Sequence, residues 1–109
     1  MITVKVKREQ ERIVSFSLRG HADAGPYGHD LVCAGVSAVS IGTENAVHAL
    51  CGVRLKVEQD EKAGGFLECT VPEDLEDETD EKVQLLLEGM VVSLEAIVLE
   101  YDQYIQFTD

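Results

Sequence analysis

The stretch that decides the fold lies between residues 13 and 37 and reads Ile-Val-Ser-Phe-Ser-Leu-Arg-Gly-His-Ala-Asp-Ala-Gly-Pro-Tyr-Gly-His-Asp-Leu-Val-Cys-Ala-Gly-Val-Ser. Its first seven residues alternate apolar and polar side chains, which is the period of a half-buried strand. A glycine-bearing segment follows. From Asp30 to about Leu50 the chain is apolar nearly all round, which predicts a helix that is buried on more than one side. The stretch therefore predicts a strand that leads through a loop into a long helix.

The flanking sequence extends this plan in both directions. Alternating patterns predict strands at residues 2–7, 53–57, 67–71 and 104–107, and apolar residues at helical spacing predict a second helix over 83–101. The polar residues 9–11 connect the first two strands as a hairpin. The sequence thus predicts one α+β domain over residues 1–109. It has a single sheet of about five strands with two long helices on one face, in the order strand-strand-helix-strand-strand-helix-strand.

The charge balance limits the classes of partner. Nine basic and 21 acidic side chains leave a net charge of -12, which disfavours direct nucleic-acid binding and favours a basic polypeptide partner. Seven of the eleven residues from Pro72 to Lys82 are acidic. The run Glu73 to Glu81 is either a solvated lead into the second helix or an attractor for a basic substrate.

Several patterns bear on the compartment. The first residues alternate apolar and charged side chains and lack the apolar centre of a signal peptide, and no apolar run is long enough to span a bilayer. Three cysteines without paired short spacing do not indicate a disulfide framework. We therefore expect a protein of the reducing cytoplasm that does not bind membranes.

His21 and Cys33 are the candidate chemical pair. A cysteine is nucleophilic as its thiolate, and a nearby histidine or the amides at a helix N-terminus favour that form. With Asp30 as N-cap, Cys33 is the third helical residue, inside the turn whose N–H groups have no helical partner. His21 leaves the second strand and would lie beside this turn if strand and helix pack together. The same amides would then stabilise the oxyanion of an attacked carbonyl.

Other interpretations of the cysteines stay open at this point. Cys33 on an apolar helix is also a typical small core residue, and Cys51 and Cys69 fit the apolar pattern of their own elements. Cys33 as a redox-sensing thiol is a further alternative, although no resolving cysteine is evident by spacing. His48 is expected to pack or to lie at the surface.

A metal site is the remaining chemical alternative. His21, His29, Asp30 and Cys33 are ligand types for zinc, but their spacing matches none of the common structural zinc patterns. His29 is expected to be a loop residue. We therefore predict neither a metal nor another cofactor.

A family resemblance rests on the same residues. Gly20-His21-Ala22, a glycine-containing loop, and then Asp30-Leu31-Val32-Cys33-Ala34-Gly35-Val36-Ser37 resemble the signature of the bacterial ribosomal-processing cysteine proteases, the Prp family. Length and element order agree over essentially the whole chain. The resemblance implies a cysteine endopeptidase that removes a short N-terminal extension from a basic large-subunit ribosomal protein. It implies Cys33 as nucleophile and His21 as general base.

The resemblance also implies supporting features. Asp30 and Ser37 match further positions of the signature, and Ser37 lies one helical turn after Cys33. Residues 22–29 match a loop thought to gate the substrate cleft, here Gly25, Pro26, Tyr27, Gly28 and His29. The family is homodimeric, and the apolar first helix offers a surface for this contact. The alternative from another class is a non-catalytic, acidic ribosome-assembly module that binds a basic ribosomal protein without cleaving it.

Overall fold

A computed structural model of the chain describes residues 1–20, 26–60 and 65–109, with residues 26–30 described as main chain only. Two strand-strand-helix units and a final strand follow one another, which confirms the predicted α+β class and element order. The elements are β1 (Ile2–Glu9), β2 (Arg12–Arg19), α1 (Pro26–Cys51), β3 (Lys56–Asp60), β4 (Phe66–Thr70), α2 (Asp77–Glu100) and β5 (Ile105–Thr108).

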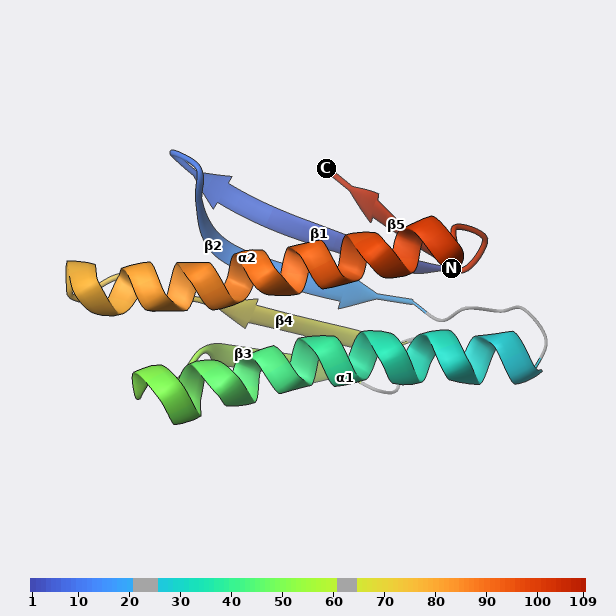
Figure 1. Ribbon diagram of the computed structural model, residues 1–109, viewed down its shortest axis with the longest axis horizontal. Helices are drawn as coiled ribbons and strands as arrows, with labels where there is room; N and C mark the ends of the chain where they lie inside the picture. The colour runs from blue at the N-terminus through green and yellow to red at the C-terminus, as the bar shows by residue number, and fades with distance from the viewer. Residues whose placement is uncertain (21–25, 61–64) are drawn as a thin grey trace.

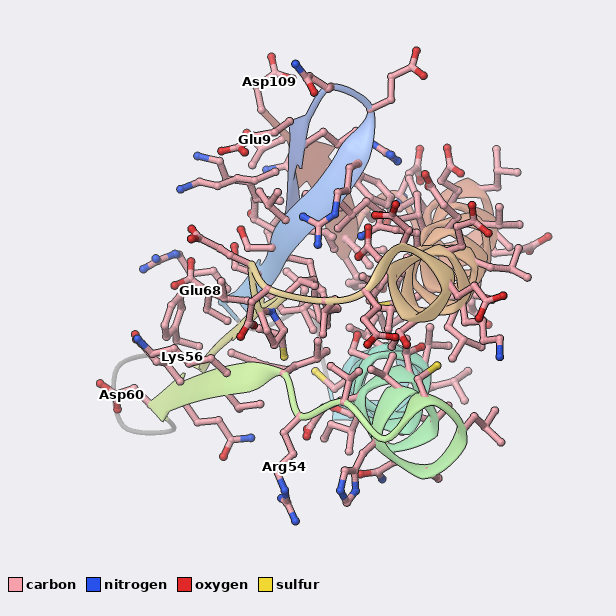
Figure 2. All side chains as sticks on the ribbon, turned by 90° about the vertical axis from the view of Figure 1, so that its left-hand side faces the viewer. Glu9, Arg54, Lys56, Asp60, Glu68 and Asp109 are labelled. Atoms are coloured by element: carbon pink, nitrogen blue, oxygen red, sulfur yellow. The ribbon has the colours of Figure 1, made fainter. Side chains whose placement is uncertain are left out.

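The five strands form one mixed sheet in the order β3-β4-β2-β1-β5. β1 pairs parallel with β5, and the other three neighbouring pairs are antiparallel. Both helices cover the same face of the sheet and run antiparallel to each other, as predicted for a two-layer domain (Figure 1). The other face carries polar side chains, among them Lys56 and Glu68, which point away from the helices (Figure 2).

The core lies between the two layers. Val4, Phe16, Leu18 and Cys69 come from the inner face of the sheet and are at most 8% exposed. The helices contribute a matching set of buried side chains, namely Val32, Val36 and Val47 from α1 and Val83, Leu87, Met90 and Leu94 from α2. The alternating pattern of the strands and the helical spacing of the second helix therefore both predicted correctly which side chains are buried.

A bulge in β2 couples the hairpin to α2. The register shifts between Lys7, which pairs with Ser15, and Arg8, which pairs with Ile13, so β2 contains one extra residue. The amide of Gln84 on α2 bonds the main chain at this point. Its Oε1 accepts from the Ile13 N–H and its Nε2 donates to the Ile13 C=O, both at 2.8 Å. The side chain thus replaces the pairing that the bulge removes.

Two ion pairs hold α2 to the same hairpin. Arg8 Nη1 lies 2.7 Å from Glu88 Oε2, and Arg12 Nε lies 2.7 Å from Asp80 Oδ2. The hydrogen bond and charge of Arg12 hold the pKa of Asp80 below its ordinary value, and Arg8 does the same to the pKa of Glu88. Acidic residues also occupy the first turn of α2, where they suit the positive end of the helix dipole.

The third strand begins later than predicted. Val53 and Leu55 are 6% and 8% exposed, as a strand pattern requires, but they lie in an irregular segment and β3 starts at Lys56. Gly52, with φ +68°, ends α1 just before them, and the chain then turns back toward the sheet. Alternating burial alone therefore does not fix where pairing starts. The final strand is likewise displaced by one residue, to Ile105–Thr108.

Candidate active site

Cys33 lies in a pocket between the N-terminal half of α1 and one end of the sheet. The pocket has a volume of about 290 Å³. Its lining is Ile2, Leu18, Gly20, Cys33, Val36, Ser37, Ile41, Gln59, Gly65, Phe66 and Leu67. Most of these side chains are apolar, so the pocket suits an apolar group beside a thiol.

The thiol of Cys33 is partly buried and packs against the core, and it is not part of a disulfide. The sequence left open whether Cys33 is a core residue or a nucleophile at a site. Its position is compatible with both, because the residue contacts the core and also lines a pocket. Ser37 is exposed and lines the same pocket, so these two residues share a helix face, as their spacing predicts.

The start of α1 corrects the expectation for Asp30. The helix begins at Pro26, so Asp30 is its fifth residue and the prediction of Asp30 as N-cap is wrong. Proline suits the first helical position, since its φ is already helical and it has no N–H to satisfy. Cys33 is consequently the eighth residue of α1, beyond the four N–H groups that lack an intrahelical partner. Helix-terminal amides therefore cannot activate this thiol.

Most of the residues predicted to form the gating loop are helical. Pro26, Tyr27, Gly28 and His29 form the first turn of α1 and were wrongly assigned to a loop. Gly25 lies outside the described residues, as do the side chains of Tyr27, His29 and Asp30.

His21 lies outside the described residues, so its distance to Cys33 stays a prediction. Gly20, the residue directly before it, lines the same pocket as Cys33. The residue next to the predicted base His21 in the sequence is therefore part of the described pocket lining.

The remaining cysteines and histidine differ from Cys33. Cys69 is fully buried, and desolvation, with the charges of Glu44 and Glu68, raises the pKa of its thiol to about 12. Cys51 is partly buried against the core, and His48 is exposed on α1. These positions agree with the structural roles predicted for them.

Within the described part of the chain, no group of three or more His, Cys, Asp or Glu residues is placed to hold a metal ion. The zinc alternative depends on His21, which lies outside that part, and on His29, of which only the main chain is described. No described helix is long and apolar enough to cross a membrane.

Sequence reasoning missed several residues of the pocket. Ile2, Leu18 and Leu67 were predicted as inward-facing strand residues, and the pocket forms where they meet α1. Phe66 also lines the pocket, and the guanidinium of Arg19 lies 4.4 Å from its ring centroid in a cation–π contact. Period-two patterns place such residues on a face but do not say which of them border an opening.

Comparison with known proteins gives consistent results. A family model described as cysteine protease Prp matches residues 1–106. The chain is 42% identical over 109 residues to the ribosomal processing cysteine protease Prp of Bacillus subtilis, which covers 99% of this chain and 96% of that protein. The Prp of Staphylococcus aureus is 39% identical over 107 residues, covering 97% and 96%.

Two solved structures of the Staphylococcus aureus protease share the fold. The complex with a substrate peptide has a TM-score of 0.84 and 36% identity, and covers 99% of this chain and 98% of that chain. The complex with a covalently linked product peptide has a TM-score of 0.82 and 38% identity over the same shares. Together with the partly buried thiol at the pocket, these matches show that the chain belongs to the Prp family of ribosomal processing cysteine proteases and is a cysteine protease.

Proposed function

We propose that this protease removes the N-terminal extension of a large-subunit ribosomal protein through a Cys33–His21 dyad. The observation that carries the proposal is the position of Cys33, which lines an apolar pocket together with Gly20, the neighbour of His21 in the sequence. A solved structure of the Staphylococcus aureus protease is a complex with a covalently linked product peptide, which supports an acyl-enzyme chemistry for this chain.

The reaction follows from these two groups. His21 takes the proton of Cys33 as Sγ attacks the scissile carbonyl, and it returns that proton to the leaving amine when the C–N bond breaks. The resulting thioester is hydrolysed by a water that His21 deprotonates, which releases the extension and restores the thiol. Ser37, one turn from Cys33 on the same helix face, is proposed to hydrogen-bond within this site.

Asp30 takes a different proposed role from the cap that was expected. It lies within α1 three residues before Cys33, which places both on neighbouring positions of the helix surface. We propose that its carboxylate orients His21, as the third residue of a catalytic triad does. The gating role is proposed for the segment that ends at Gly25, since Pro26–His29 are helical.

The charge distribution suits a basic substrate in the cytoplasm. The acidic segment before and within the first turn of α2 lies at the opposite end of the molecule from the start of α1, along a long axis of 45 Å (Figure 1). Its carboxylates therefore attract the body of a basic ribosomal protein without crowding the pocket. Such long-range attraction mainly speeds encounter, and the same charge repels nucleic acid.

A homodimer is proposed through the helix layer. Leu85, Val92 and Leu99 follow one another at intervals of seven along α2 and are 74%, 65% and 86% exposed. Leu31 and Ile41 are large exposed apolar residues on α1. A row of large exposed apolar side chains along a helix, such as the one on α2, is typical of a protein interface. Val92→Glu should convert a dimer to a monomer in sedimentation velocity, while the exposed sheet substitution Lys56→Glu should not. A wild-type monomer at every concentration would refute the proposal.

The catalytic proposal is tested with the purified chain and the extended ribosomal protein, with intact mass as the readout. Wild type should yield a product shortened at its N-terminus. Cys33→Ala and His21→Ala should fold normally and lose a factor on the order of 10⁴ in rate. Cys51→Ala, which removes another partly buried thiol of α1, should cleave like wild type. Undiminished cleavage by either dyad variant contradicts the mechanism.

A further inference from the structure

Gly20 lies at the point where three segments of the chain meet. It follows β2, and its N–H donates to the Gly65 C=O at 2.9 Å, just before β4. On its other side a Cβ would stand 2.5 Å from the main-chain oxygen of Met1. Its φ is +92°, and the residue lines the pocket that contains Cys33.

We propose that Gly20 is a positioning residue of the protease, because its main chain sets the direction in which the chain leaves β2 toward His21. The proposal rests on the proposed function, since it takes His21 as the base. No residue with a side chain can replace Gly20 without moving this junction.

Two independent restrictions exclude a side chain here. A φ of +92° is strained for any L-residue with a Cβ. The clash with Met1 is a separate restriction, and it involves main chain rather than the flexible end of a side chain. The neighbouring Ile2 is itself held, because its N–H donates to the Tyr104 C=O at 2.8 Å and it pairs with Ile105 in β5.

The junction is therefore closed on both sides, by Gly65 and by the start of β1. Gly20→Ala requires the 2.5 Å approach to open to ordinary contact at 3.4 Å or more, a displacement of about 0.9 Å. A misplacement of about 1 Å between reacting groups costs roughly 100-fold in rate. Since His21 directly follows Gly20 in the sequence, we expect this displacement to disturb the proposed pairing of His21 with Cys33, and with it the pH dependence of the thiol's reactivity.

The chain offers a matched control. Gly52 has φ +68° at the end of α1, and a Cβ there meets nothing within 4 Å. Its N–H donates to the His48 C=O, so it is a helix-terminal glycine outside the pocket. Gly52→Ala introduces the same type of backbone strain without a clash. This control therefore separates the effect of backbone strain from the effect of a displaced main chain.

The experiment compares both variants with wild type by thermal unfolding, by kcat/KM on the extended ribosomal protein, and by the pH dependence of Cys33 alkylation with iodoacetamide, read by peptide mass. Both variants should unfold at lower temperature. Gly20→Ala should lose about 100-fold in kcat/KM, and its alkylation midpoint should shift in the same direction as that of His21→Ala. Gly52→Ala should keep the wild-type midpoint and stay within about twofold in rate.

A wild-type midpoint and rate in Gly20→Ala would overturn the proposal. If that variant does not fold, Gly20→Asn carries the test, because asparagine tolerates positive φ better and keeps the clashing Cβ. If wild type fails to cleave the ribosomal protein, the proposed substrate is wrong. The alkylation midpoints still decide the role of Gly20 in that case, since they need no substrate.

Discussion

Gln84 bonds both main-chain groups of Ile13 at the bulge, so Gln84→Met should destabilise the fold measurably. Methionine has a similar stem and a similar helix propensity, and it therefore removes the two hydrogen bonds, together with a smaller contribution of the Gln84 amide to the Asp80 carboxylate. Ile13 is 0% exposed, which means that its N–H and C=O have little other access to partners.

The magnitude follows from these two bonds. Each net hydrogen bond contributes about 1 kcal/mol, and a buried group left without a partner costs about 1–3 kcal/mol. Gln84 itself is partly exposed, so water reaches the site when the amide is removed, which favours the lower part of this range. We expect the free energy of unfolding to fall by about 2 kcal/mol, or Tm by about 8 °C for a domain of this size.

Urea unfolding measures this directly, with Lys82→Met as the control. Lys82 is exposed on the same helix, so its replacement should change the free energy of unfolding by less than about 0.5 kcal/mol. The slope with urea should be the same in all three proteins, because the surface exposed on unfolding is unchanged. If Gln84→Met matched the control, the amide would not be what secures the bulge to α2.

Three further substitutions or modifications test the description of the interior and the surface. Ser40 is 0% exposed and its Oγ has no hydrogen-bond partner in the described part of the chain, so Ser40→Ala should raise the free energy of unfolding by about 1 kcal/mol in the same urea assay. Arg12 lowers the pKa of Asp80, so the pair stabilises the fold above the ordinary aspartate pKa, and this contribution is lost as the pH falls through the lowered value. Asp80→Asn should therefore be less stable than wild type at pH 6 and should lose less stability on acidification to pH 3, and equal pH slopes would contradict the assignment. Native protein treated with a thiol reagent at pH 8 should be modified at Cys33 and not at Cys69, whose pKa is raised to about 12, with peptide mass as the readout.

The sheet and both helices could be predicted because each rests on a period that burial enforces. Phe16 and Leu18 alternate with serines and face the helices, and Val83, Leu87 and Leu94 recur at helical spacing on the side of α2 that faces the core. The start of α1 could not be predicted in the same way. Asp30 is the better capping side chain, but Pro26 is compatible with a first helical turn, and sequence alone does not weigh one against the other.

The candidate site was predictable only in part. Helical spacing put Cys33 and Ser37 on one face, and both line the pocket. The contribution of Ile2 depends on where the start of the first strand lies relative to α1, and the approach of Met1 to Gly20 depends on main-chain packing between distant segments. Neither leaves a pattern in the sequence, because each arises from the assembled sheet.

The parallel pairing of β1 with β5 has a consequence for the order of folding. Ile2 pairs with Ile105, so this contact closes a loop of nearly the whole described chain, whereas the β1–β2 hairpin is local. Loop-closure entropy favours the local pairs first, so β5 is expected to dock late. Until it docks, Ile2 lacks its main-chain partners Tyr104 and Ile105, although Thr3 already pairs with Arg19 in the hairpin, and the part of the pocket that Ile2 lines is not yet fixed. We therefore expect the protease to become competent only when its last strand is in place, so that incompletely folded chains do not act on the proteins around them.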